Sequence, residues 1–179
     1  FHARPLPSLP PEIEAAVKAT DVSIYAAQTA PGELGSFRLP YLKAIDSNKR
    51  IRHAHMIQIT KAIMEDGMCV DYALVRKVTA KVKEFVTGAR EIRVETALGT
   101  DIVAGFHPDT KWIACDGNIL PGTWTNLPDG ETFTCPETVN GVAVIDGVLG
   151  DVMQKFGSLE KCPVTVKIKA GRVTGIQGS

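Results

Sequence analysis

The carboxylate of Glu131 is the first side chain in this sequence whose position suggests chemistry. It follows the turn segment Leu127-Pro128-Asp129-Gly130, in which proline presets φ and Asp-Gly tolerates unusual backbone angles. If residues 132–135 are extended, Glu131 and Phe133 point to the same side of the strand. An acid on the side of a phenylalanine either lies at a rim or binds something that compensates its charge. Spacing alone favours the simpler interpretation, a solvated acid at a hairpin.

A second pattern that could do chemistry is the segment His53-Ala54-His55. Two histidines at positions i and i+2 of a strand share a face, and metal sites use such spacing. No third ligand lies nearby in the sequence, and a helix could already begin here. Structural or partner-contact histidines are therefore favoured over metal ligation, and the role of the pair stays open.

Composition excludes several classes of protein. The chain has 179 residues, a formal net charge of zero, 44% hydrophobic and 22% charged residues, which is ordinary for a globular protein of one or two domains. It contains no run of five basic residues and no apolar run of membrane-spanning length, so we expect neither nucleic-acid nor membrane partners. It begins without methionine and ends at Ser179, and we expect a piece of a longer protein.

The cysteines indicate a reducing compartment. Cys69, Cys115, Cys135 and Cys162 form no Cys-x-x-Cys pair, which argues against a zinc ribbon or a thioredoxin-type motif. Two disulfides are compatible with four cysteines, but free buried thiols are favoured because no signal-peptide pattern is present. A cytoplasmic location follows.

Periodicity predicts a mixed α/β (α+β) fold, with a helical amino-terminal half, residues 1–89, followed by a β-rich half, residues 90–179, that contains antiparallel hairpins. The first half could be the end of an amino-terminal domain. The boundary lies at 88–90, where the hydrophobic period changes from about four to two. The first half is assigned as follows: a helix at 12–20, a strand buried on both faces at 21–27, a loop at 30–40 with Arg38 facing solvent, and helices at 56–65 and 71–87.

The β-rich half contains two predicted hairpins and the turn that precedes Glu131. The first hairpin joins residues 92–95 to 102–106 through Gly99-Thr100-Asp101, and the second joins 164–169 to 172–176. The Gly-Thr-Asp segment could bind an anion through its backbone N–H groups, but a plain turn is the better interpretation. No Gly-x-Ser-x-Gly, His-Glu-x-x-His or phosphate-binding glycine loop is present.

An ordered set of short motifs resembles the M29 family of thermophilic metallo-aminopeptidases, the group of aminopeptidase T, over roughly residues 50–179. The matching segments are Asp71-Tyr72, Glu91–Val94, Leu98–Ile102, Asn126–Glu131, Phe133–Pro136, Asn140-Gly141 and Lys169–Arg172. Each segment is weakly specific, and their common order carries the resemblance.

The resemblance implies a cytosolic homodimeric hydrolase that removes amino-terminal residues from peptides. It implies two divalent ions, Zn, Co or Mn, and makes Glu131 a metal ligand. Two such ions can activate a bridging water for attack on the scissile carbonyl. In the family the other ligands, an acid, two histidines and an aspartate, lie further downstream than this chain extends.

The four histidines present, His2, His53, His55 and His107, do not match the M29 ligand motif. One carboxylate cannot hold a dinuclear site, so we predict no peptidase activity for the chain as given. Two alternatives stay open. One is a related ring-cleaving dioxygenase of dihydroxypyridines, whose family holds one iron with ligands downstream. The other is a non-catalytic scaffold.

Overall fold

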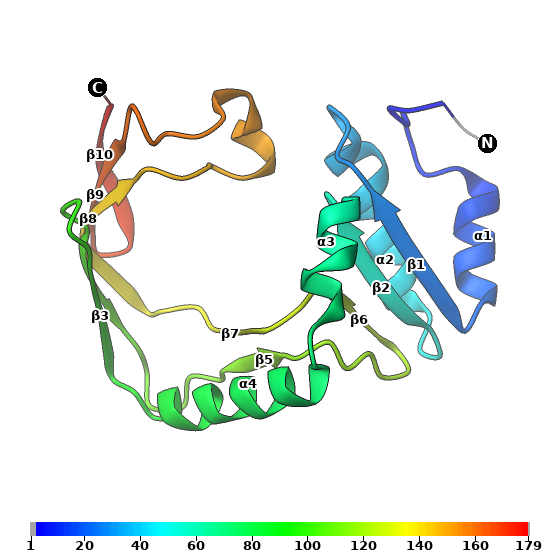
Figure 1. Cartoon of the computed structure of the whole chain (residues 1–179), viewed down its shortest axis with the longest axis horizontal. Coiled ribbons are helices and arrows are strands. Elements are labelled where there is room, and N and C mark those ends of the chain that lie inside the picture. The colour runs from blue at the N-terminus through cyan, green and yellow to red at the C-terminus, as the bar shows by residue number, and fades with distance from the viewer. Residues whose placement is uncertain (1–2, 179) are drawn as a thin grey trace. The chain divides into compact units, whose positions relative to one another are not determined.

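A computed structural model describes residues 3–178, with the side chains at 151, 152 and 154 left out. His2 lies outside these residues. The chain divides into two compact units, and each is described by itself (Figure 1). Unit 1 comprises Phe1–Val82 and Ala114–Thr132, and unit 2 comprises Lys83–Ile113 and Phe133–Ser179. The predicted boundary at 88–90 stays a prediction.

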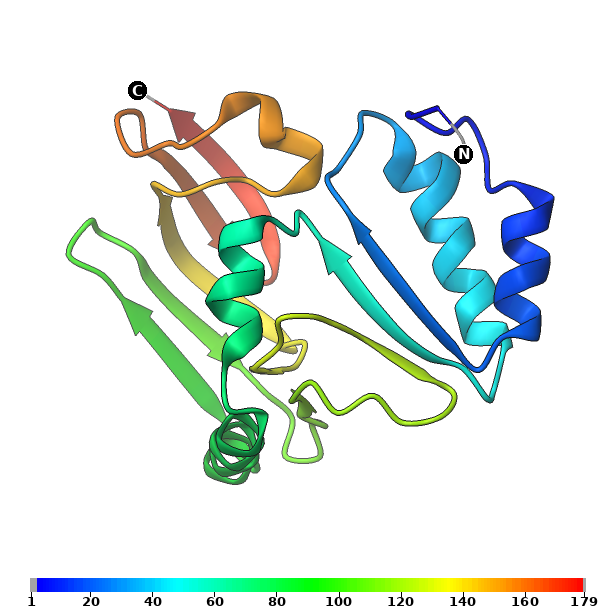
Figure 2. The ribbon, with the colours of Figure 1, turned by 45° about the vertical axis from the view of Figure 1, so that its right-hand side comes forward.

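Unit 1 is built on a parallel sheet with the strand order β1-β2-β6. Helices α1 and α2 lie against one face of this sheet (Figure 2). The elements of unit 1, in chain order, are α1 (Pro11–Ala19), β1 (Val22–Ala27), the π-helical turn η1 (Leu34–Arg38), α2 (Leu39–Ser47), β2 (Arg52–Ile57), α3 (Lys61–Glu65), the 3-10 turn η2 (Gly67–Cys69), most of α4 (Tyr72–Val86) and β6 (Thr123–Asn126).

The core of unit 1 lies between the sheet and these helices. Its buried residues come from α1, η1, α2 and the start of β2: Val17, Phe37, Tyr41, Ala44, Ile45 and Ile51. The side chains of β1 alternate, so that Tyr25 packs against this core while Val22 and Ile24 are 55% and 65% exposed. The prediction that the strand at 21–27 is buried on both faces is therefore wrong, because β1 is an edge strand.

Unit 2 contains an antiparallel sheet of five strands in the order β10-β9-β8-β4-β3. Its elements are β3 (Glu91–Glu95), β4 (Asp101–Gly105), β8 (Thr138–Ile145), the 3-10 turn η3 (Asp151–Phe156), β9 (Val164–Lys169) and β10 (Arg172–Gly178). Outside this sheet, the short strands β5 (Ile113–Cys115) and β7 (Glu131–Phe133) pair with each other, and most of their residues belong to unit 1. Gly99 and Thr100 lie in the predicted β3–β4 turn, with Gly99 at φ 101°, whereas Asp101 begins β4 and pairs with Glu95.

The mixed fold class is confirmed, with most helices in the amino-terminal half and antiparallel hairpins in the second half. The longest helix was predicted at 71–87 and is α4, and the Asp71 carboxylate accepts hydrogen bonds from the N–H groups of Ala73 and Leu74. Two local assignments were wrong. In the loop predicted at 30–40, residues 34–40 are helical, and Arg38 is buried rather than facing solvent. Met56 lies in strand β2 rather than starting a helix.

Candidate functional site

The turn before Glu131 is organised by the carboxylate of Asp129. Its Oδ2 accepts hydrogen bonds from the N–H of Gly117 at 3.1 Å and from the hydroxyl of Thr125, and its Oδ1 accepts one from the N–H of Gly130 at 2.9 Å. Three donors therefore converge on one half-buried acid. They join the end of β6 to the loop after β5, which places Glu131 at the start of β7.

Glu131 lies beside two other potential ligands. Each of Cys115, Asp129 and Glu131 offers one potential ligand atom, and these three atoms lie within 4.8 Å of one another. Cys115 and Asp129 are partly buried, and Glu131 is exposed. Burial raises the pKa of the Cys115 thiol, and the charges of Asp129 and Glu131 raise it further. The thiol is therefore held in its neutral form beside two acids.

Strand β7 alternates as the sequence predicts. Glu131 and Phe133 are both exposed on one side. On the other side, the Thr132 hydroxyl donates to the carbonyl of Thr79 in α4 at 3.1 Å. Helix α4 thus holds the strand that carries Glu131.

The same helix shapes the loop that bonds Asp129. A Cβ on Gly117 would lie 2.3 Å from the ring of Tyr72, and Gly117 has φ 75°. Arg76 pairs with Asp116 at 3.7 Å. Any larger residue at position 117 would therefore displace either the helix or the N–H that holds Asp129.

The histidines that the structure describes do not join this cluster. His53 and His55 share a face of β2, as the i, i+2 spacing predicts for a strand, but both lie in the core of unit 1. His107 is exposed and lies 3.5 Å from Asp109. Among the described residues, the Cys115–Asp129–Glu131 cluster is the group of three metal-binding side chains that the geometry brings together.

Sequence reasoning singled out Glu131 and missed its two neighbours. Asp129 was treated only as a turn residue, and Cys115 only as a free thiol. All four cysteines are free, as predicted, but Cys69, Cys135 and Cys162 are exposed rather than buried. An Asp that follows proline in a turn is a weak signal for a site. Nothing local to Cys115 indicates that β5 pairs with β7.

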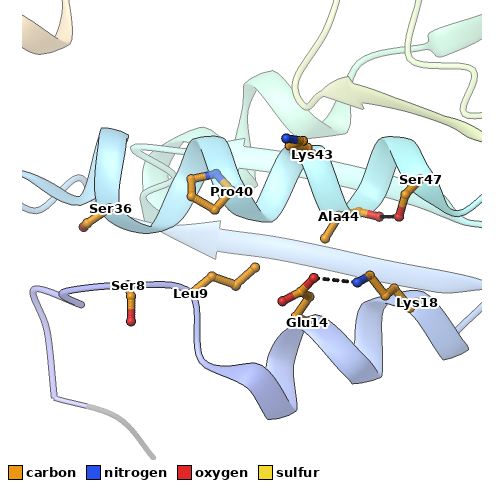
Figure 3. Close-up of a pocket in the computed structure, with 9 residues that line it drawn as sticks. All are labelled: Ser8, Leu9, Glu14, Lys18, Ser36, Pro40, Lys43, Ala44 and Ser47. Atoms are coloured by element: carbon orange, nitrogen blue, oxygen red, sulfur yellow. Dashed lines mark hydrogen bonds and ion pairs between the residues drawn. The ribbon is translucent and has the colours of Figure 1, made fainter.

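A groove of about 500 Å³ lies elsewhere in unit 1, between α1 and the η1–α2 segment (Figure 3). Leu9, Pro40 and Ala44 supply its apolar wall, and Glu14 and Lys18 pair with each other within α1. It shares no residue with the Cys115–Asp129–Glu131 cluster. Its charged groups lie at an open surface, so it lacks the converging polar groups of a ligand site.

Comparison with known proteins decides the family. A family model described as 2,5-dihydroxypyridine 5,6-dioxygenase (NicX) matches residues 51–179. The chain belongs to this family. A curated 2,5-dihydroxypyridine 5,6-dioxygenase from Pseudomonas putida is 33% identical over 95 residues, which are 50% of this chain and 26% of that protein.

A solved structure supports the same fold. The 2,5-dihydroxypyridine dioxygenase of Pseudomonas putida KT2440 matches with a TM-score of 0.60 and 20% identity, over 93% of this chain and 45% of that one. The present chain thus spans less than half the length of both relatives.

These findings overturn the assignment to the M29 aminopeptidases. The hydrolase and aminopeptidase activities and the peptide substrate inferred from that resemblance were wrong, because the matched family and both relatives are dioxygenases of a dihydroxypyridine. The motifs behind the resemblance are mostly turns, caps and strand ends, which specify backbone shape rather than reaction. No helix among the described residues is both long and apolar enough to cross a membrane.

Proposed function

We propose that this chain is part of a ring-cleaving dioxygenase that acts on a dihydroxypyridine. The match of the family model to residues 51–179 carries this proposal. A dioxygenase places both atoms of O2 in its product. The description of the matched family supports a hydroxylated, electron-rich aromatic ring as the proposed substrate.

A metal ion is part of the proposal, and Glu131 is its proposed ligand in this chain. Two carboxylates and a thiol within 4.8 Å suit a divalent cation in charge and donor type. Non-haem iron(II) oxygenases commonly use two histidines and one carboxylate, and this cluster has no imidazole. Asp129 already accepts three hydrogen bonds. The cluster therefore does not match that iron site, and we assign it one ligand only.

The identities Zn, Co or Mn and a count of two ions followed from the aminopeptidase resemblance, so we propose a single divalent ion instead. Glu131 is the most available of the three groups because its side chain is exposed. A bound cation would offset the repulsion between Glu131 and Asp129, and it would favour the Cys115 thiolate. When bound, such an ion supplies a Lewis acid.

The test uses the natural protein that contains these residues, supplied with iron(II). We expect loss of dihydroxypyridine absorbance with uptake of one O2 per ring, and ¹⁸O2 should place two labelled atoms in the product. Failure to consume O2 with the iron-loaded protein would overturn the proposal, as would release of leucine from a leucyl substrate. Retention of fold with neither activity would indicate the non-catalytic scaffold.

A matched pair of variants tests the role of Glu131. Glu131→Gln keeps the shape of the side chain and removes its charge, so bound metal per chain should fall. Glu137→Gln changes another exposed acid outside the cluster and should leave metal content unchanged. Equal metal content in both variants would remove Glu131 from the site.

A homodimer also stays a prediction, which a light-scattering mass of twice 19.3 kDa for this chain would confirm.

A further inference from the structure

A hydrogen-bonded chain of polar side chains crosses the core of unit 1. Ser23 Oγ lies 2.8 Å from His53 Nδ1, and His53 Nε2 lies 3.1 Å from His55 Nδ1. The histidines are 0% and 1% exposed. Register explains the contact, because Ser23 of β1 is paired with His53 of β2, and alternate residues of a strand share a face.

Aromatic rings enclose the two imidazoles on several sides. Tyr25 stacks on His55, with ring centres 4.8 Å apart and planes 14° apart. Trp124 of β6 meets His55 edge-on at 5.8 Å, and Tyr41 of α2 meets His53 edge-on at 5.3 Å. The pair therefore ties two strands to α2 in a region that excludes water.

The charged groups around the pair do not favour a protonated, positively charged imidazole. Arg38 of η1 is buried, and its charge opposes protonation of His55. Among the described residues, the buried carboxylate is that of Glu33, which is 1% exposed and already accepts hydrogen bonds from Arg4 and from the N–H of Leu6.

On the side of α2, the carboxylate of Asp46 is exposed and accepts a hydrogen bond from Trp124 Nε1 at 3.0 Å. The buried Nε2 of His55 has no hydrogen-bond partner among the described residues. A proton taken up by the pair would thus be buried without a counter-charge.

We propose that the His53–His55 pair is an acid-sensitive latch, which holds β1 and β2 against α2 while both rings are neutral and releases them when the pair takes up protons. One neutral ring donates to the other, and Ser23 fixes the orientation of His53. A doubly protonated pair has two N–H groups facing each other and cannot keep this bond. The latch is a property of unit 1 and does not depend on the proposed reaction.

The direction of the pH dependence follows from burial. Burial lowers the pKa of His53 and of His55 to about 4, from 6.5 in the unfolded chain. The unfolded chain therefore binds protons at a higher pH than the folded chain. The stabilisation is fully present above the unfolded pKa of 6.5 and is lost as the pH falls towards 4. Between pH 7 and pH 5 the folding equilibrium constant should fall about 20-fold for each histidine.

Urea unfolding of unit 1 is followed by the fluorescence of Trp124. The protein carries the substitution Trp112→Phe, so that Trp124 is its remaining tryptophan. Because each histidine contributes about 20-fold, we expect the folding equilibrium constant of the parent to fall about 400-fold between pH 7 and pH 5. His55→Gln should be less stable at pH 7, and on acidification it should lose only the roughly 20-fold contribution of His53. His107→Gln, which changes an exposed histidine, should keep the full pH dependence. Equal pH dependence in His55→Gln and the parent would overturn the proposal.

A second measurement needs no substitution in the latch. The ring ¹⁵N signals of the two buried histidines report their protonation directly. We expect both rings to stay neutral at pH 5.5 in the folded protein. Titration of either buried ring near its unfolded value, with no change in stability, would refute the latch even if His55→Gln failed to fold.

Discussion

Removing the charge of Glu131 should activate the Cys115 thiol. The two groups lie within 4.8 Å, and the Glu131 carboxylate is one of the charges that raise the pKa of Cys115. Two unit charges at that distance repel by about 0.9 kcal/mol in water and by more in a less polar site. Because Glu131 is exposed, the water value applies as a lower bound. The thiolate fraction of Cys115 in Glu131→Gln should rise about fourfold or more.

The assay is the rate of alkylation by iodoacetamide at pH 7 and low salt. The other three cysteines are exposed, so each is changed to serine to leave Cys115 as the single thiol. Alkylation proceeds through the thiolate, so its rate follows the thiolate fraction. Adding about 1 M salt shortens the screening length to roughly 3 Å and should reduce the difference between parent and variant.

Two outcomes would refute this reasoning. Equal alkylation rates in the parent and in Glu131→Gln at low salt would show that the two side chains do not interact in solution. A difference that persists unchanged at high salt would point to altered access rather than charge. Glu137→Gln, another exposed acid outside the cluster, should leave the rate unchanged.

Three further substitutions test the packing of each unit, with urea unfolding followed by circular dichroism. Arg4→Met removes the hydrogen-bonded ion-pair partner of the buried Glu33 carboxylate and should cost about 3 kcal/mol. The double variant with Glu33→Met should recover stability, and no recovery would argue against the ion pair. Asn48→Ala frees carbonyls at the end of α1 and should cost about 2 kcal/mol, with Asn48→Asp no better; a neutral Asn48→Asp would contradict this. Gly141→Ala places a Cβ 2.0 Å from the carbonyl oxygen of Asp101 at φ 125° and should cost about 4 kcal/mol or more by separating β4 from β8; an unchanged unfolding midpoint would show that the strands shift freely.

Local signals in the sequence determined several elements correctly. The 71–87 pattern contains an apolar stripe, a capping aspartate and a closing glycine, and it forms α4 (Tyr72–Val86) with Gly88 at φ 81°. Alternation predicted the β3–β4 and β9–β10 hairpins. These signals lie within a few residues of one another, so the chain expresses them without distant contacts. The loop prediction for Ala30–Pro40 was wrong. The glycines and prolines of this segment are compatible with a helical turn, and the burial of Phe37 and Arg38 favours that turn.

The family could not be read from the same signals. Turns, caps and strand ends are shared by proteins whose chemistry differs, because they satisfy backbone geometry rather than bind a substrate. The segment Asn126–Gly141 therefore indicated a candidate acid, Glu131. The resemblance of its motifs to the M29 aminopeptidases, however, predicted the wrong reaction, peptide hydrolysis. Matches across the whole of residues 51–179 identified a dioxygenase family instead.

The sequence by itself determined the mixed fold class, the long helix, the hairpins and the turn that presents Glu131. Only the tertiary structure brought Cys115 beside that acid and its neighbour Asp129, since β5 and β7 pair across a loop that no local pattern describes. It also placed His53 and His55 in a core, where they contact Ser23 and Tyr25. The physical reason is common to both cases. A side chain's charge and partners depend on which strands meet, and long-range pairing is set by burial across the whole unit.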